Sequence, residues 1–346
     1  MKEKWQQDLA AFLNDWSDDK TYILGKTSGS TGIPKTIRLS KKAMVASALR
    51  TNRFFQLKAN DPVLLCLPVN YIAGKMVIVR AMVGQLNLIA VPPVSLPQWE
   101  GDIALAAMVP MQVHNLLADK EGRKRLSTVS KLLIGGSSVS ESLIDKLLDF
   151  QVDSYLSYGM TETVSHVALC RVKDKKDKED KEDKRMIYTA LPDVFFTIDD
   201  RNCLVVHAPH LQEEGQAKPF VTNDVVELLS ESSFCWLGRW DHVINSGGIK
   251  LFPETIECKI SHLIDSRFYI TSSPDEILGQ QLILKVESPA WSEPEMALFR
   301  QKAAALLSKY EIPKKIVFVD KFEETDTGKV KRDELHTVIT VLNKCG

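Results

Sequence analysis

Residues 27–35 read Thr-Ser-Gly-Ser-Thr-Gly-Ile-Pro-Lys, and this loop constrains the chain more than any other feature. Its two glycines can adopt positive φ and let backbone N–H groups converge on an anion, while four hydroxyl side chains add short donors. The pattern therefore predicts a phosphate-binding loop. It is not a Walker A loop, because Pro34 stands where that pattern requires glycine. The predicted phosphate-binding residues are Thr27, Ser28, Gly29, Ser30, Thr31, Gly32 and Lys35.

Length and composition are typical of a globular enzyme. A chain of 346 residues, 44% hydrophobic and 26% charged, can bury a large core and predicts two domains. The formal net charge of −1 argues against a nucleic-acid-binding protein. The six cysteines form no C-x-x-C pair, which argues against a zinc site and a disulfide framework. No apolar stretch approaches the length of a membrane span, and the start of the chain lacks an apolar signal region, so we expect a cytoplasmic protein without membrane insertion.

Hydrophobic periodicity predicts alternating helices and strands in the first 150 residues, and hence α/β layers. Beyond Tyr188 the apolar runs are short, which predicts a small antiparallel β subdomain. After Asp241 the pattern returns to mixed α/β. The predicted helices cover residues 5–16, 75–83 and 140–150, and the predicted strands cover residues 22–24, 63–67, 86–91, 132–134, 194–198, 203–207, 225–229 and 234–237.

Residues 173–185 are an unbroken run of charged side chains, seven basic and six acidic. The two signs nearly cancel, and such a segment cannot bury apolar surface. We interpret it as a solvated surface loop of the large domain rather than as a partner-binding segment.

Four further segments follow the phosphate loop along the chain. Residues 157–162 read Ser-Tyr-Gly-Met-Thr-Glu, and residues 222–224 read Thr-Asn-Asp. Residues 238–250 read Gly-Arg-Trp-Asp-His-Val-Ile-Asn-Ser-Gly-Gly-Ile-Lys, and residues 327–332 read Thr-Gly-Lys-Val-Lys-Arg. Together with the loop, they resemble the signatures of the superfamily of acyl-CoA synthetases, luciferases and peptide-synthetase adenylation domains, with Asn223 in place of a glycine.

The resemblance implies a fold and a chemistry. It implies a large layered α/β domain over residues 1–240, lacking most of the family's initial subdomain because the phosphate loop comes so early, and a small mobile α+β domain over residues 241–346. The reaction would be two-step activation of a carboxylate with ATP, Mg²⁺ and coenzyme A. First the carboxylate attacks the α-phosphorus to give an acyl-adenylate and pyrophosphate, and then a thiol displaces AMP.

The family's roles can be carried over residue by residue. Lys329 would bridge the attacking carboxylate and the α-phosphate, Thr161 would hydrogen-bond that phosphate, and Glu162 would hold Mg²⁺. Asp224 would accept the ribose hydroxyls with support from Arg239. Asp241 would be the hinge between the two half-reactions. The remaining nucleotide residues would be Gly135, Gly136, Ser137, Ser157, Tyr158, Gly159 and Met160, and the thioester loop would comprise Ser246, Gly247, Gly248 and Ile249.

The acyl substrate is predicted from one segment. Residues 67–74, Leu-Pro-Val-Asn-Tyr-Ile-Ala-Gly, resemble a stretch of the o-succinylbenzoate–CoA ligases of menaquinone biosynthesis, with Tyr71 where those ligases have histidine. Those ligases also carry an arginine at the position of Arg80, and their substrate has a second carboxylate that a guanidinium can bind through two hydrogen bonds. Gly74 and Lys75 complete the predicted acyl site. A structural salt bridge is the alternative role for Arg80, and a structural role is favoured for Lys75.

Three alternatives stay open at the level of the sequence. The chain can be another aryl- or acyl-CoA synthetase, an adenylation enzyme that loads a carrier-protein thiol, or a degenerate nucleotide-binding regulator. The joint presence of Lys329, Glu162 and Asp224 argues against the regulator. The expected partners are small molecules, and the sequence leaves the oligomeric state open, a homo-oligomer included.

Overall fold

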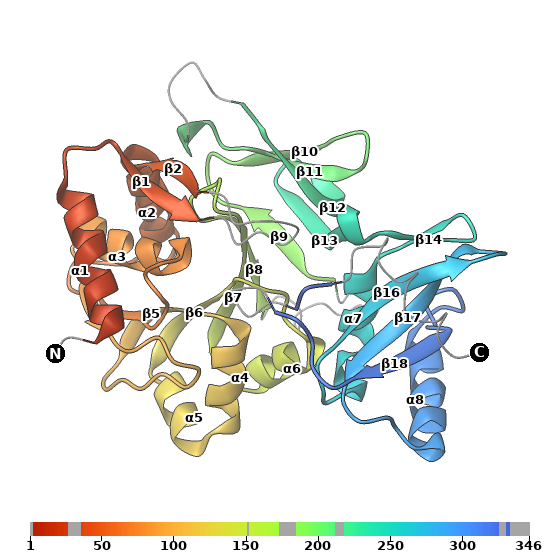
Figure 1. Ribbon diagram of the computed structural model, residues 1–346. Helices are drawn as coiled ribbons and strands as arrows, with labels where there is room; N and C mark the ends of the chain where they lie inside the picture. Colours follow the sequence, from red (N-terminus) through yellow and green to blue (C-terminus); the bar gives the residue numbers. More distant parts are fainter. Residues whose placement is uncertain are drawn as a thin grey trace.

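A large mixed sheet runs through the middle of the protein, with helices on both of its faces (Figure 1). The computed structural model describes residues 3–26, 36–150, 152–172, 185–211, 218–324 and 330–332. Within this part, the sheet has the strand order β10-β11-β12-β13-β9-β8-β7-β6-β5-β3-β4. Its strands are β3 (Pro62–Leu65), β4 (Asn87–Ala90), β5 (Ile103–Met108), β6 (Val129–Ile134), β7 (Asp153–Gly159), β8 (His166–Arg171), β9 (Ile187–Ala190), β10 (Phe195–Ile198), β11 (Cys203–His207), β12 (Phe220–Ser230) and β13 (Ser233–Arg239).

The sheet changes character along its width. Strands β4, β3, β5, β6 and β7 pair in parallel, whereas β8 pairs antiparallel with β7 and all later neighbours are antiparallel. The antiparallel strands predicted beyond Tyr188 are therefore present, and they continue the large sheet instead of forming a separate one. The mixed α/β class predicted from the sequence is confirmed.

The parallel strands are buried on both faces, which explains their nearly continuous apolar sequences. Successive residues of a strand point to opposite faces, and in β5 Leu105 and Ala107 join one core while Ala106 and Met108 join the other. The first core includes side chains of α1 (Lys4–Ser17), α2 (Lys41–Phe54) and α3 (Ile72–Gly84). The second core includes side chains of α4 (Pro110–Ala118), α5 (Lys120–Leu126) and α6 (Glu141–Phe150).

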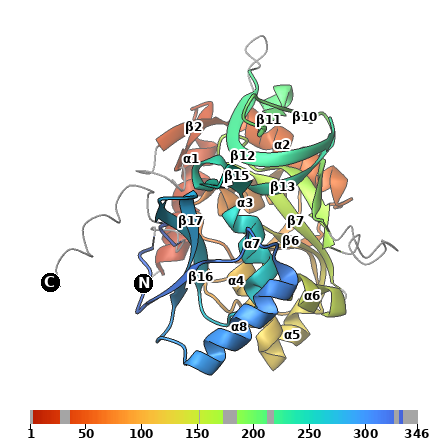
Figure 2. The same cartoon turned by 90° about the vertical axis from the view of Figure 1, so that its right-hand side faces the viewer.

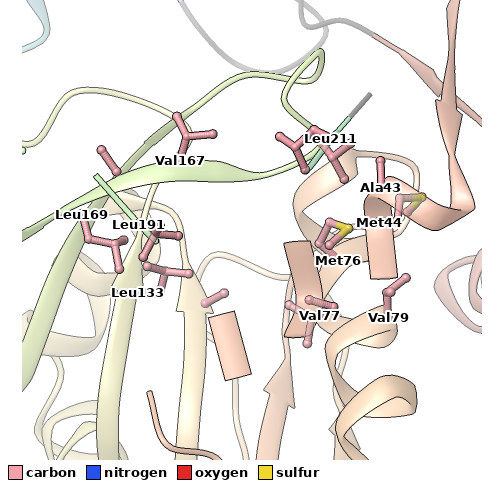
Figure 3. Close-up of a cluster of buried hydrophobic side chains, with 14 of the residues drawn as sticks. Ala43, Met44, Met76, Val77, Val79, Leu133, Val167, Leu169, Leu191 and Leu211 are labelled. Carbon is pink, nitrogen blue, oxygen red and sulfur yellow. The ribbon is translucent and has the colours of Figure 1, made fainter. Parts of the chain in front are cut away.

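The first core ties the α2–α3 pair to the start of the antiparallel half of the sheet. Figure 3 shows Met44 and Met76 close to Leu211, with Leu133 facing Leu169 from β8. Leu211 belongs to the short helix η2 (Pro209–Leu211). This packing joins α2 and α3, the helix of the predicted acyl residues, to η2.

The C-terminal part forms a second, smaller sheet with its own core (Figure 2). Its order is β15-β14-β17-β16, and β18 pairs in parallel with β17. The core of this part gathers apolar side chains from residues 244–307, among them Ile256, Leu284 and Phe299. Its elements are η3 (Trp240–His242), β14 (Ile244–Ser246), β15 (Ile249–Leu251), α7 (Pro253–Ile260), η4 (Ser261–Leu263), β16 (Phe268–Asp275), β17 (Gly279–Glu287), α8 (Glu293–Leu306) and β18 (Lys315–Val319).

Candidate active site

The predicted phosphate loop connects two short strands. Residues 27–35 lie outside the described residues, but β1 (Tyr22–Lys26) and β2 (Thr36–Ser40) flank them as an antiparallel pair in which Lys26 faces Thr36. The loop therefore joins the two arms of a hairpin. A Cβ added to Gly25 would lie 3.4 Å from Cγ2 of Thr161, so the loop end of the hairpin lies against the residue predicted to bind the α-phosphate.

The residues predicted to surround the adenine of the nucleotide come from the carboxyl ends of two neighbouring parallel strands. Ser157, near the end of β7, donates a hydrogen bond of 3.0 Å to the carbonyl of Ile134, the last residue of β6. A Cβ on Gly135 would lie only 2.3 Å from Oγ of Ser157, so glycine is needed for this approach. Gly136 has φ +92°, which also favours glycine. Ligands of open α/β sheets bind beyond such carboxyl ends, which is where Ser137 follows as an exposed residue.

A tight turn follows β7 and presents Thr161 and Glu162. The hydroxyl of Thr163 fixes this turn through contacts with the Met160 backbone N–H at 3.0 Å and the Ser165 carbonyl at 2.8 Å. Val164 sits at φ +66°, a strained value for a β-branched residue. A Cβ on Gly159 would collide with the Ser165 carbonyl at 2.4 Å, so this glycine allows the chain to fold back.

Asp224 is held by donors from three directions. Its Oδ2 accepts a hydrogen bond of 2.7 Å from the Tyr158 hydroxyl, and its Oδ1 accepts one of 3.2 Å from Nε1 of Trp236. A guanidinium nitrogen of Arg239 lies 3.6 Å from the same Oδ1. Burial, together with the charge of Asp224, raises the pKa of Tyr158 well above its usual value, so the phenol stays protonated and donates. The carboxylate is thus oriented at the end of β7, where Tyr158 lies.

Asp241, the predicted hinge, is hydrogen-bonded on both sides. Arg239 donates to its Oδ2 at 2.9 Å, and the amide of Asn223 donates to its Oδ1 at 3.1 Å. Burial lowers the pKa of Arg239, but Asp224 and Asp241 outweigh it and the net direction is upward. The side-chain oxygen of Asn223 in turn accepts from Arg201 at 2.9 Å. Sequence reasoning missed Arg201, whose only signal was its place in a polar turn.

The predicted thioester loop is the tip of a hairpin. Ser246 of β14 pairs with Ile249 of β15, and Gly247 and Gly248 between them have φ +60° and +81°. Two consecutive positive φ values are those of a type I′ turn. The N–H of Gly247 also donates to the Leu278 carbonyl at 2.8 Å, which fixes the tip to the β16–β17 hairpin.

The segment with the predicted catalytic lysine is tied to α7. Lys329 itself lies outside the described residues, but Val330 forms a β-bridge with Glu324. Arg332 then donates a hydrogen bond of 2.6 Å to Oε2 of Glu257, and its other terminal nitrogen lies 3.8 Å from Glu254. These contacts fix the chain directly after Lys329.

The four predicted acyl residues lie at the start of α3 or within it, but each one contacts a different part of the protein. Tyr71 is the N-cap, and a Cβ on Gly74 would lie 2.4 Å from the Pro68 carbonyl, so this glycine permits close packing of the helix start. The Lys75 ammonium lies 5.1 Å from the ring centre of Phe12 on α1. Arg80, only 3% exposed, points elsewhere and donates to Oγ of Ser165 at 2.6 Å.

Arg80 is a buried cation without an acid. Burial lowers its pKa to about 10, which leaves it charged at neutral pH. Within the described ranges no carboxylate lies in ion-pair distance of it, and its Nε has no hydrogen-bond partner. Ser165, the one partner that the described part of the chain offers, was not among the sequence-predicted residues. Its signal was its place three residues after Glu162, the end of the Thr-Glu motif.

Few candidate metal ligands lie in the described part of the site. Within the described ranges, no cluster of three or more His, Cys, Asp or Glu side chains can hold a metal ion. Glu162 is an exposed single carboxylate. This set fits Mg²⁺, which binds through one or two carboxylates plus substrate phosphates and water, and does not fit a cage of protein ligands. No helix in the described part is both long and apolar enough to cross a bilayer.

Known proteins share both sequence and architecture with this chain. The profile of the family described as AMP-binding enzyme matches residues 2–206. A curated relative, the 2-succinylbenzoate–CoA ligase of Lactococcus lactis subsp. lactis (strain IL1403), is 24% identical over 93% of this chain and 72% of its own length. The corresponding ligase of Salmonella typhimurium (strain LT2) is 25% identical over 86% of this chain and 66% of its own length.

Two solved structures illustrate the likeness in three dimensions. An acyl-CoA synthetase (AMP-forming)/AMP-acid ligase II-like protein from Dyadobacter fermentans DSM 18053 is 32% identical, with a TM-score of 0.61, and the match covers 96% of this chain and 93% of that one. The o-succinylbenzoate coenzyme A synthetase of Bacillus subtilis, solved with ATP and a magnesium ion, has a TM-score of 0.75 at 19% identity. That match covers 90% of this chain and 69% of the Bacillus chain.

Proposed function

Because the chain belongs to the AMP-binding enzyme family, we propose that it joins o-succinylbenzoate to coenzyme A in menaquinone biosynthesis, through an acyl-adenylate. As a member of this family the chain is an ATP-dependent, AMP-forming ligase, and the substrate is the proposed part. The observation that supports this substrate is the environment of Arg80. It is a fully charged guanidinium inside the protein with a hydroxyl and no carboxylate beside it in the described part of the chain.

The nucleotide would lie across the ends of β6 and β7. Residues 27–35 would receive the phosphates, Gly135, Gly136 and Tyr158 would border the adenine, and Asp224 would accept the ribose hydroxyls. A carboxylate has about four acceptor positions, and the two hydrogen bonds from Tyr158 and Trp236 leave room for ribose. The fixed orientation of Asp224 supports this role because a sugar can then bind without reorganising the carboxylate.

The first step brings two anions together. An oxygen of the carboxylate would attack the α-phosphorus, the bond to the β-phosphate oxygen would break, and pyrophosphate would leave. Lys329 would hold both anions, and Thr161 would donate to the α-phosphate. Mg²⁺ held by Glu162 would neutralise phosphate charge. The second step would form the thioester when the sulfur of coenzyme A attacks the acyl carbon and AMP leaves.

Two steps with different groups require the C-terminal part to turn on the rest of the chain. We place the domain boundary between residues 240 and 241, with Asp241 as hinge. In this arrangement Thr255 of α7 donates a hydrogen bond of 2.6 Å to the Leu237 carbonyl of β13, across the proposed boundary. Rotation at Asp241 would break this contact and bring Ser246, Gly247, Gly248 and Ile249 to the site in place of Lys329.

The substrate would use both of its carboxylates. The carboxylate on the succinyl arm would be activated, while the ring carboxylate would meet Arg80. A buried guanidinium gains most from a bidentate anion, because such charge-assisted hydrogen bonds offset its desolvation.

The test is pyrophosphate release with ATP and Mg²⁺ against o-succinylbenzoate, benzoate, 4-phenylbutyrate and octanoate, each with and without coenzyme A. A matched control acid is 4-oxo-4-phenylbutanoate, which lacks only the ring carboxylate. We expect turnover on o-succinylbenzoate, product formation only with coenzyme A, and weak turnover on the control acid. Equal turnover on both acids would remove the role of Arg80, and turnover on another acid would keep the ligase chemistry with a different substrate.

A further inference from the structure

A chain of hydrogen-bonded side chains runs through the protein interior from α2 to α3. This polar file consists of Thr51, His166, Ser165 and Arg80. Arg80 Nη2 lies 2.6 Å from Oγ of Ser165, and this oxygen lies 3.3 Å from Nδ1 of His166. On the other side of the imidazole, Nε2 lies 3.2 Å from Oγ1 of Thr51, which donates to the Ser47 carbonyl at 3.1 Å. Thr51 is fully buried and His166 is 6% exposed. These groups therefore have few alternatives to one another.

The chemistry of the groups gives the file a single direction. Thr51 has one hydroxyl hydrogen, which goes to the Ser47 carbonyl, so Thr51 can only accept from His166. Nε2 of His166 then carries the hydrogen, and its bare Nδ1 accepts from Ser165. With its own hydrogen in use, Ser165 can only accept from Arg80, and a guanidinium can only donate. Every hydrogen bond in the file thus supports the next.

The file suits a charged Arg80 because the imidazole inside it is neutral. Burial lowers the pKa of His166 well below its usual value, and the charges of Arg80 and Arg50 lower it further. A protonated imidazole would offer a hydrogen on Nδ1 and could not accept from Ser165.

The guanidinium has little else to hold it. Arg80 Nε has no partner in the described part of the chain, and a small apolar cavity lies beside the side chain, lined by Val63, Val77 and Leu105 among others. The hydroxyl of Ser165 is therefore the polar contact that fixes the direction of the guanidinium. The direction of that hydroxyl depends on His166 and Thr51.

We propose that Thr51 and His166 are positioning residues, which act through Ser165 to orient Arg80 toward the second carboxylate of the substrate. This role rests on the proposed function, because it assigns Arg80 to the ring carboxylate of o-succinylbenzoate. It goes beyond that function by extending substrate selection to a helix residue that touches no substrate.

The first test exchanges the hydroxyl of Thr51. In Thr51→Val the shape is kept and the file is broken, and we expect the KM for o-succinylbenzoate to rise about tenfold, the effect of one lost hydrogen bond. The KM for ATP, the kcat, and the KM for 4-oxo-4-phenylbutanoate should change less than about twofold, since Arg80 serves only the ring carboxylate. Thr51→Ser keeps the hydroxyl and is the matched control. A KM rise for both acids, or for neither, would overturn the proposal.

The second test exchanges His166 and does not depend on turnover. His166→Gln offers an acceptor and a donor in similar places and should retain more discrimination between the two acids than His166→Phe. In the ¹⁵N-labelled wild-type enzyme at pH 7, we expect the imidazole signal that disappears in His166→Gln to be that of the neutral Nε2–H tautomer. A protonated ring or the Nδ1–H tautomer would overturn the file itself. Lack of wild-type turnover on o-succinylbenzoate would instead overturn the proposed function, and with it the substrate role of the file.

Discussion

Arg80 on α3 and Arg332 near the C-terminal limit of the described chain are both largely removed from water, yet their surroundings differ. Arg332 lies between two carboxylates, with Glu257 at 2.6 Å and Glu254 at 3.8 Å, and its guanidinium carbon lies 5.7 Å from the centre of the Tyr269 ring. Burial lowers the pKa of Arg332, but the two carboxylates outweigh it and raise the pKa overall. Arg80 has a hydroxyl as its partner, and burial alone moves its pKa, downward.

The difference distinguishes a structural cation, Arg332, from the cation that we propose to bind substrate, Arg80. A buried charge is costly unless an opposite charge and hydrogen bonds offset its desolvation. Arg332 finds that offset inside the chain, so its charge serves the fold and fixes the segment that follows Lys329. Arg80 lacks it within the described part, so an anion from outside would bind there favourably. Four substitutions can break or sharpen this comparison.

Lys329→Ala tests whether the catalytic role proposed for Lys329 is separate from the structural role of the nearby Arg332. We expect adenylate formation to fall about a thousandfold, because a preorganised charge on the reacting phosphate is lost. Thioester formation from supplied acyl-adenylate should persist, since the ion pairs of Arg332 and the thioester loop are untouched. Single-turnover assays of each half-reaction measure both effects. Equal losses in the two halves would contradict the role of Lys329.

Arg80→Met tests whether Arg80 binds substrate instead of stabilising the fold. We expect the KM for o-succinylbenzoate to rise about a hundredfold, in keeping with loss of a charge-assisted bidentate contact. Thermal stability should not fall, because methionine fills similar space without a charge to desolvate. Steady-state kinetics with both acids and thermal unfolding measure these effects. A lower melting temperature with unchanged discrimination between the acids would make Arg80 structural, like Arg332.

The sequence predicted the elements around Arg80 but not its contacts, and around Arg332 it predicted only a mixed α/β pattern. The apolar runs at 63–67 and 86–91 and the helix at 75–83 correspond to β3, β4 and α3, because continuous burial and helical spacing both leave a local pattern. The contact between Arg80 and Ser165 spans 85 positions, and that between Thr51 and His166 spans 115. Such contacts depend on how α2 and α3 pack on the sheet, and no periodicity records them.

The predicted site shows the same limit. Gly135 and Gly247 could be singled out because close approach and positive φ leave glycine as a visible mark. Asn223 was noted only as a substitute for glycine, yet it bridges Arg201 and Asp241, the predicted hinge residue. A side chain that works through hydrogen bonds to distant partners leaves no such mark in the sequence.

Arg332→Met should cost folding free energy where Arg80→Met does not. Removal of Arg332 leaves one buried carboxylate, Glu254, and one partly buried carboxylate, Glu257, without this cation. We expect a loss of about 3 kcal/mol at pH 8. Burial raises the pKa of Glu257 from 4.5 to about 7 even with Arg332 opposing it, and loss of Arg332 raises it further. A carboxyl with a raised folded-state pKa stabilises fully below its unfolded value and loses that contribution as pH rises through the folded value. The deficit should therefore shrink from pH 8 to pH 5.

Calorimetric unfolding at both pH values measures this deficit, and Arg267→Met is the matched control. Arg267 pairs with Glu287 and Glu324 on the surface, where its side chain is 42% exposed. Its removal should cost at most about 1 kcal/mol. A deficit as small for Arg332, or one that grows at low pH, would break the comparison between Arg80 and Arg332.

Asp224 extends the comparison to a charge of the opposite sign, which has internal donors and is still proposed to bind a ligand. Tyr158→Phe removes the donor at 2.7 Å and leaves Trp236 and Arg239 in place. We expect the KM for ATP to rise about fivefold, the effect of one hydrogen bond that orients the carboxylate, with no change in the KM for the acid. If the KM for ATP stays constant, Trp236 and Arg239 suffice to orient Asp224. A charged side chain would then count as structural only when partners in the protein use all of its hydrogen-bond donors or acceptors. Arg332 comes nearer to that condition than Asp224.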